Sequence, residues 1–259
     1  MNRMPVIFVG HGSPMNVIEN NDFTRAWSAI GQRMPRPSAI LCISAHWYTD
    51  GYFVSTAEQP ETIHDFYGFP AELYEIQYPS KGAPDLAKRV TEITKGAVQS
   101  DSEQGLDHGT WSVLKFMYPK VDIPVCQLSV NGGNTTQENY NLGKMLQPLR
   151  DEGVLILGSG NVVHNLGLMN ASKEQEGYPW AVEFDTYIKE AIASFNHEGV
   201  INYHKAGESA RFAFKHRDHY DPLLYILGSV DHGERVEVFN EARVMGSLSM
   251  TSYLIGNNG

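Results

Sequence analysis

Short apolar runs of strand length alternate along the chain with segments of helical periodicity. Four of the runs are apolar almost without interruption, which is typical of strands covered on both faces, because neither face meets water. They span residues 6–9, 39–44, 123–130 and 154–157. A later run, 247–255, alternates weakly between apolar and polar residues, and we expect it to close one edge of a sheet.

Three segments carry apolar residues on one face at helical spacing, namely 86–93, 142–149 and 180–195. Pro84 and Asp85 suit the first turn of the first helix, and Pro148 predicts that the second helix ends near it. Core packing explains all three faces. The alternation predicts an α/β fold with a mainly parallel central sheet flanked by helices. The length of 259 residues favours one large domain, 1–259, with a sizeable core.

Residues 58–84 interrupt this alternation. The segment is rich in prolines and aromatic residues, which include Pro60, Phe66, Tyr67, Phe69, Pro70, Tyr74, Tyr78 and Pro79. We expect a long excursion over the surface. Long loops in compact domains are often functional, so this segment is a candidate wall of a binding site.

Composition and charge restrict the possible partners. The formal net charge is −10, with the acidic residues spread along the chain, which argues against nucleic acid or an anionic membrane as a partner. No apolar stretch approaches the length of a membrane span, and the first apolar run is too short for a signal peptide. Cys42 and Cys126 lie within apolar runs and are predicted to be buried, inert thiols. These features predict a cytoplasmic protein.

Three of the ten histidines follow predicted strands. His11 lies in the segment 10–14 (GHGSP), His46 in 44–47 (SAHW) and His164 in 158–165 (GSGNVVHN). In open α/β sheets the ligand crevice lies beyond the carboxyl ends of the strands, so these side chains are expected to converge on one rim. Neutral imidazole suits zinc, iron, copper and nickel, and three such ligands leave coordination positions open for chemistry. The pattern predicts a metal site.

A fourth histidine, His108, begins a short predicted helix that runs through residue 117. The cationic form of a histidine is disfavoured near a helix N-terminus, so His108 is a candidate neutral base. An ordinary turn histidine held by Asp107 fits the spacing equally well.

The remaining histidines have weaker assignments. His216 and His219 precede a predicted helix that begins in the segment 220–225; one of them completes the metal site, or both are exposed. His64 lies in the aromatic excursion, where it could face substrate. No carboxylate stands out as a further ligand, and Asp218 and Asp221 are interpreted as solvated or capping residues. Three histidines in polar surroundings are predicted to lie on the surface: His197, His204 and His232.

At these motifs the chain resembles the class III extradiol ring-cleaving dioxygenases of the LigB type, and specifically the subgroup called 4,5-DOPA dioxygenase extradiol. The resemblance rests on seven segments in order, which are 10–14, 44–47, 62–70, 107–111, 159–165, 219–225 and 245–250. It implies a LigB-like (phosphorylase/hydrolase-like) fold. It also implies cleavage of the ring of a catechol, a DOPA-like aromatic diol, with O2.

The resemblance carries residue roles with it. It implies one divalent metal per chain, Fe(II) for activity with Zn(II) also able to occupy the site, held by His11, His46 and His219. It places His164 beside the metal, either as a further ligand or as the acid/base, with His108 in support. Relatives usually have a Pro-Thr-Pro-like stretch before the third ligand, whereas this chain has FKHRD at 214–218. That departure leaves His216 as a weaker candidate ligand and bears on which catechol fits.

Two other interpretations fit the same histidines. A zinc-dependent hydrolase on this scaffold would suit an all-histidine site. However, the sequence has neither an HExxH motif nor a GxSxG elbow, and no base or oxyanion-stabilising group can be identified. Metal binding or sensing without catalysis is disfavoured by the strand-end setting and the aromatic stretch. The predicted partners are a small aromatic diol and O2, and the predicted assembly is a monomer or a small homo-oligomer.

Overall fold

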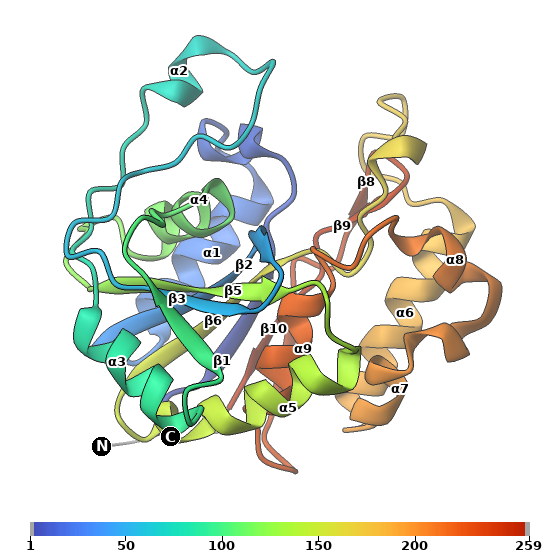
Figure 1. Ribbon diagram of the computed structural model, residues 1–259. Helices are drawn as coiled ribbons and strands as arrows, with labels where there is room; N and C mark the ends of the chain where they lie inside the picture. Colours follow the sequence, from blue (N-terminus) through green and yellow to red (C-terminus); the bar gives the residue numbers. More distant parts are fainter. Residues whose placement is uncertain (1–2, 257–259) are drawn as a thin grey trace.

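A computed structural model describes residues 3–256 and has an eight-stranded sheet at its centre (Figure 1). The strand order is β4-β3-β5-β2-β6-β1-β10-β7. These strands are β1 (Val6–Gly10), β2 (Ala39–Thr49), β3 (Tyr52–Ser55), β4 (Val98–Asp101), β5 (Val125–Asn131), β6 (Val154–Gly160), β7 (Val236–Phe239) and β10 (Ser252–Ile255). The strand pairs β5–β2, β2–β6 and β6–β1 are parallel. The pairs β3–β5, β1–β10 and β10–β7 are antiparallel. The mainly parallel α/β sheet is confirmed.

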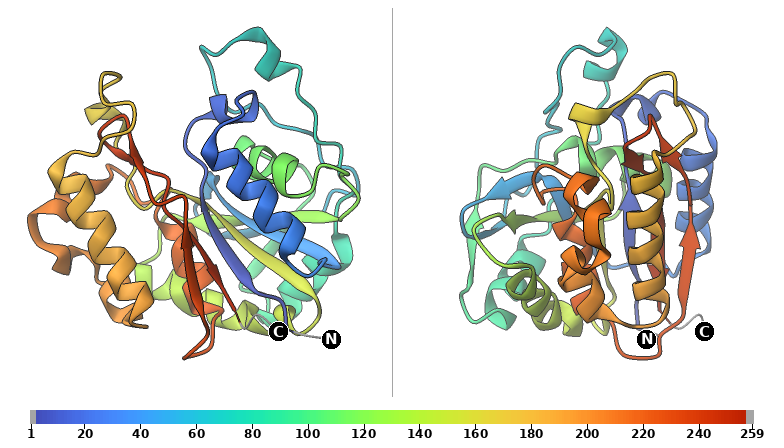
Figure 2. Two further views of the ribbon diagram at one scale, coloured as in Figure 1. Left: turned by 180° about the vertical axis from the view of Figure 1, so that it is seen from behind. Right: turned by 90° about the vertical axis from the view of Figure 1, so that its right-hand side faces the viewer.

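Helices cover both faces of the sheet. The α-helices are α1 (Asp22–Arg33), α2 (Ala71–Tyr74), α3 (Pro84–Ile93), α4 (His108–Met117), α5 (Thr136–Leu146), α6 (Pro179–Ala193), α7 (His197–Ile201), α8 (Ala210–Ala213) and α9 (Asp221–Gly228). Successive residues of a strand point to opposite faces. Ile7 and Val9 of β1 therefore pack towards α1 and α4, whereas Val6 and Phe8 pack towards α5 and α9. Seen from behind, α1 lies across one face of the sheet (Figure 2).

Each predicted strand and helix is present, with two differences. Strand β2 continues five residues beyond the predicted end at Ser44, so that His46 lies inside the strand and not in a turn after it. The late run divides into a separate two-residue strand, β9 (Leu248–Ser249), paired with β8 (Arg243–Val244), and β10. The expectation that this run closes a sheet edge is wrong, because β10 lies between β1 and β7.

Local sequence signals explain where the helices begin and end. Asn21 and Thr24 form a capping box at the start of α1, in which each side chain binds the other residue's backbone N–H. The carboxylate of Asp107 caps α4 by accepting from the backbone N–H of Thr110. As predicted, α5 ends near Pro148, which lies in the short 3₁₀ turn that follows it.

The excursion predicted at 58–84 stands out from the rest of the molecule, with α2 at its tip (Figure 1). It is tied to the body near both ends by single bridges, Thr62 to Leu106 and Gly82 to Val125. Near its first bridge, the indole N–H of Trp111 donates to the carbonyl of Ile63 at 2.8 Å. The excursion is thus anchored at its base, beside the N-terminus of α4.

Cys42 and Cys126 are free, buried thiols, as predicted, and burial raises the pKa of both. Within residues 3–256 there is no helix that combines the length and the apolar character needed to cross a bilayer.

A buried ion pair closes the end of the sheet away from the histidines. Arg150 is 1% exposed and donates two hydrogen bonds to Glu234, at 2.8 and 2.7 Å, and further ones to the carbonyls of Met4 and Ser229. Burial raises the pKa of Glu234, but the hydrogen bonds from Arg150 and from the backbone of Asp231, together with the positive charges of Arg150 and Arg3, outweigh burial, so the pKa lies below its usual range. The stabilisation is therefore present at neutral pH and is lost as the pH falls through that lowered pKa.

We predict that Arg150→Met lowers the free energy of unfolding by about 3–5 kcal/mol, because it leaves a buried carboxylate and two carbonyls without their donor. Urea denaturation at pH 7 measures the loss. The double variant Arg150→Met/Glu234→Leu should recover most of it, since no charge is then left buried. A single variant as stable as the wild type would contradict the prediction.

Candidate metal centre

Three histidines from three distant parts of the chain meet at the carboxyl ends of the central strands. His11 follows β1, His46 lies in β2, and His219 immediately precedes Tyr220 and α9. Each offers a ring nitrogen, and these atoms all lie within 4.8 Å of one another. His11 and His219 are buried and His46 is half-buried. The predicted convergence on one rim is therefore observed for His11 and His46, with His219 as the third member.

Backbone geometry brings these side chains together. A Cβ atom at Gly160, the last residue of β6, would lie 2.1 Å from the carbonyl oxygen of His219, so only glycine allows that segment to approach. The backbone N–H of Asn161 then donates to the same carbonyl at 2.9 Å. In β2, the register against β5 shifts between Ile43 and Tyr48, and this irregularity contains His46.

Hydrogen bonds orient the His11 ring. Its Nδ1 lies 2.9 Å from the hydroxyl of Ser159. That hydroxyl donates its own hydrogen to the carbonyl of Gly109, at 2.6 Å, so it is left to accept from Nδ1–H of His11. The tautomer that follows leaves Nε2 of His11 without a hydrogen and directed at the other histidines.

His46 is oriented in a similar way. Its Nδ1 lies 3.3 Å from Oδ2 of Asp65, a carboxylate that only accepts hydrogen bonds. Its Nε2 lies 3.1 Å from Nε2 of His11. If both nitrogens lack a hydrogen, they repel each other at this separation unless a cation lies between them. Nitrogens bound to one metal at about 2.0–2.1 Å are separated by about 3.0–3.4 Å, so the pair fits a metal ion.

His219 adds a buried nitrogen. Its Nδ1 lies 3.1 Å from Oδ1 of Asp218 but has no hydrogen-bond partner within the described residues. Asp218 therefore faces the cluster and is not simply solvated. The ring of His164 stacks on that of His219, with centroids 3.4 Å apart and an angle of 7° between the planes. His164, Asp218 and His219 form a second group of potential ligand atoms within 4.8 Å of one another.

Asp65 links the cluster to the excursion. Its Oδ2 accepts from Nδ1 of His108 at 2.9 Å, and its Oδ1 accepts from the backbone N–H of His108 at 2.8 Å. The ring centroids of His108 and His46 are 3.9 Å apart. Burial raises the pKa of Asp65, but the side-chain and backbone hydrogen bonds from His108, together with the electrostatic attraction of His108 and His46, outweigh burial, so the pKa is lowered. His108 is thus held by Asp65 and not by Asp107, which caps α4.

The histidine cluster is arranged to remain neutral. Burial lowers the pKa of His46 to about 3, with repulsion from His108 as the second cause. Burial likewise lowers the pKa of His164 to about 4. The pKa values of His11 and His219 lie well below the usual range, first because of burial and then because of the other histidines. Neutral imidazoles at pH 7 have lone pairs free for a metal.

The structure separates the other predicted candidates from the cluster. His216 is exposed and belongs to none of the three groups of potential ligands found within residues 3–256. The ring of His64 lies in the excursion, where Nε2 meets the carbonyl of Ile76 at 2.9 Å. His204 and His232 are exposed as predicted, but His197 is half-buried.

Two carboxylates near the cluster were not identified correctly from sequence. Asp65 lies in the segment 62–70, but the sequence alone indicates no role for it, because its partner His108 is 43 residues away. Asp221 is fully buried and not solvated, and burial raises its pKa to about 7. Asp221 lies in the first turn of α9, and its carboxylate accepts a hydrogen bond from the side-chain amide of Asn139 at 3.0 Å.

Known proteins resemble this chain over nearly its whole length. The family described as "Catalytic LigB subunit of aromatic ring-opening dioxygenase" matches residues 5–256. The 4,5-DOPA dioxygenase extradiol of Escherichia coli K12 is 44% identical over 261 residues, covering 98% of this chain and 95% of that protein. The protein of the same name from Beta vulgaris is 36% identical over 261 residues, covering 97% and 96%.

A solved structure is also similar. It is a crystal structure of an uncharacterized protein from Escherichia coli K12, which is 40% identical in sequence to this chain. The two structures superpose with a TM-score of 0.86, over 98% of this chain and 100% of that one.

We predict that His46→Ala removes bound metal, since the histidine trio then loses one of its three ligand nitrogens, and the neighbouring His108 is held by Asp65. Elemental analysis after dialysis against a weak chelator measures the metal content. His216→Ala is the matched control and should retain one equivalent of metal. Metal retained by His46→Ala, or lost by His216→Ala, would contradict this arrangement.

Proposed function

This chain belongs to the LigB family of aromatic ring-opening dioxygenases, and from that premise we propose which of its residues carry out the reaction. The family and the named relatives make it an extradiol ring-cleaving dioxygenase that acts on an aromatic substrate with O2. The earlier resemblance is thereby confirmed. The alternative of a zinc-dependent hydrolase has no support from these relatives. LigB dioxygenases depend on a metal, and the histidine groups described above could bind one.

The proposed ligands are His11, His46 and His219. The supporting observation is that Nε2 of His11 and Nε2 of His46 lie 3.1 Å apart, with the unpartnered Nδ1 of His219 beside them. When bound, the metal supplies the positive charge that favours the ionised diol and brings diol and O2 together. Fe(II) is the proposed active metal; zinc suits the same imidazoles but has no redox chemistry.

Two further histidines flank this trio and are the proposed acid/base groups. His108 lies beside His46, and because its Nδ1 binds Asp65, its Nε2 is free to accept a proton from a catechol hydroxyl. The Asp65 carboxylate then stabilises the imidazolium that forms. His164 lies on the other side, stacked on His219, and its lowered pKa keeps it neutral at pH 7. We assign proton transfer to both, in keeping with the usual role of positioned histidines.

The substrate proposed for this site is a DOPA-like catechol, after the printed names of the relatives. We further propose that residues 1–259 act as one catalytic domain, as a monomer or small homo-oligomer, with no nucleic-acid or membrane partner. The eight-stranded sheet, at whose carboxyl ends the histidine cluster lies, supports one domain. The two free, buried thiols suit a reducing, cytoplasmic setting.

The central test is oxygen consumption. Protein loaded anaerobically with Fe(II) should take up O2 in proportion to the catechol consumed, when offered a panel that includes DOPA, and should form a yellow ring-opened product. An oxygen electrode and the visible spectrum measure both. Protein loaded with Zn(II) is the control and should be inactive. An absence of O2 uptake with every catechol in the panel would contradict the proposal.

A second test concerns Asp65. We predict that Asp65→Asn weakens metal affinity about 10- to 100-fold, because carboxylates that orient a ligand histidine commonly contribute this much. Competition with a coloured chelator measures the affinity. Glu72→Gln, which neutralises an exposed carboxylate in the same excursion, should leave affinity unchanged. If the two variants bind metal equally well, Asp65 has no orienting role.

A further inference from the structure

A hollow of about 550 Å³ next to the histidine cluster is lined by an unusual set of residues, and we call it the basic hollow. Arg211, Lys215 and Arg217 supply three cations to its wall, and His204 and His216 add two imidazoles. None of its lining residues in the described part of the chain is acidic. This is a marked local excess of positive charge in a chain whose net charge is −10.

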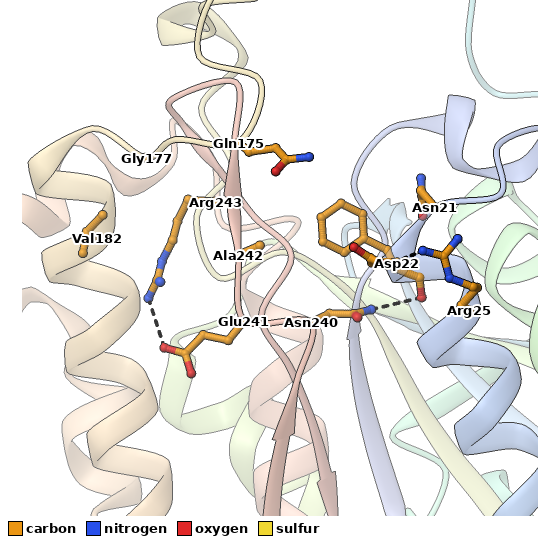
Figure 3. Close-up of a pocket in the computed structure, with 11 residues that line it drawn as sticks. Asn21, Asp22, Arg25, Gln175, Gly177, Val182, Asn240, Glu241, Ala242 and Arg243 are labelled. Carbon is orange, nitrogen blue, oxygen red and sulfur yellow. Dashed lines mark hydrogen bonds and ion pairs between the residues drawn. The ribbon is translucent and has the colours of Figure 1, made fainter.

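A second hollow, of about 630 Å³, provides a contrast (Figure 3). It lies between the start of α1 and the segment 240–243, and it contains charges of both signs. Arg25 pairs with Asp22, and Arg243 lies 3.7 Å from Glu241. Because its charges already face one another, this hollow offers no unbalanced field for a charged ligand.

The basic hollow adjoins the proposed metal ligands along the chain. Tyr48, in its wall, is two residues beyond His46, and Arg217 is two residues before His219. Two residues of extended chain span at most about 7 Å. A third wall residue, Phe214, forms a backbone bridge with His164. The hollow is therefore within reach of a substituent on an aromatic ring whose diol lies at the histidines.

The three cations differ in whether they already have hydrogen-bond or ion-pair partners. Arg217 is largely buried, donates to the carbonyl of Asn134 and lies 3.8 Å from the buried Asp221. Arg211 and Lys215 are exposed, and neither has an ion pair within residues 3–256. Arg211 and Lys215 are thus the groups available to a ligand, while Arg217 adds to the field.

We propose that the basic hollow binds a carboxylate carried on the side chain of the catechol, so that the enzyme selects anionic catechols over neutral or cationic ones. This inference rests on the proposed function. The recognition is electrostatic: Arg211 and Lys215 attract the carboxylate, and the aromatic rings of Tyr48 and Phe214 contact the linking carbons.

The test compares three substrates that differ in charge. For the Fe(II)-loaded enzyme we expect kcat/KM to be highest for 3-(3,4-dihydroxyphenyl)propionate, lower for 4-methylcatechol and lowest for dopamine. Added salt should reduce this preference, since exposed charges are screened beyond about 10 Å at 0.1 M. Equal values for all three substrates would overturn the proposal.

A charge-removing variant locates the effect. Arg211→Gln/Lys215→Gln should lower kcat/KM for the propionate about tenfold, the range expected for two exposed ion pairs, and change it less than twofold for 4-methylcatechol. The matched control, Lys81→Gln/Lys88→Gln, removes the same charge from exposed residues near α3 and should alter neither value. A variant that loses both substrates equally would contradict a carboxylate site.

A binding measurement separates this proposal from the proposed function. Calorimetry on Zn(II)-loaded protein, without O2, compares the propionate with 4-methylcatechol and needs no turnover. Tighter binding of the propionate that disappears in Arg211→Gln/Lys215→Gln supports the hollow even if no catechol is ever cleaved. Equal affinity for the two compounds, or an unchanged preference in the variant, refutes it even if the enzyme is active.

Discussion

Two imidazole nitrogens that face each other at 3.1 Å, Nε2 of His11 and Nε2 of His46, form the contact around which the histidine cluster is built. In water such a pair would separate or share a proton. Here the backbone at the carboxyl ends of β1 and β2 holds the two rings together, and burial disfavours the charged form of both. A cation between the two nitrogens removes the repulsion. The contact is therefore suited to two ligands of one cation.

The surroundings of the pair make sense as supports for that arrangement. Ser159 and Asp65 each occupy the Nδ1 side of one ring, and this leaves the Nε2 atoms free to face each other. Gly160 lets the His219 segment approach close enough to bring in a third nitrogen. Ser159 and Asp65 thus act on ring orientation, and Gly160 acts on the approach of the backbone. Orientation, more than the mere presence of histidines, is what distinguishes a metal centre from a group of polar turns.

The sequence predicted those parts that depend on local periodicity. The central strands and the helices α3, α5 and α6 follow from patterns that span only a few residues, and the strand-end rule then brings His11 and His46 together. Asp65 was missed because its partner His108 is 43 residues away, and a loop has no periodicity to signal the contact. The end of β2 was missed because Ser44 and His46 are polar, although the strand continues through them. Burial of Asp221 depends on Asn139 of α5, which no local pattern indicates.

The centre combines two kinds of framework, and the difference bears on how it can change. His11 and His46 are held by strands whose neighbours are buried on both faces, so their positions tolerate little variation. Asp65 comes from the protruding excursion, and Arg217 and Asp218 come from the segment that joins α8 to α9. Loops of this kind accept substitutions and insertions more readily than core strands do. On the proposed assignment, metal binding therefore depends on the rigid geometry of the sheet, whereas the choice among catechols can be altered in the loops without moving the nitrogens that face each other.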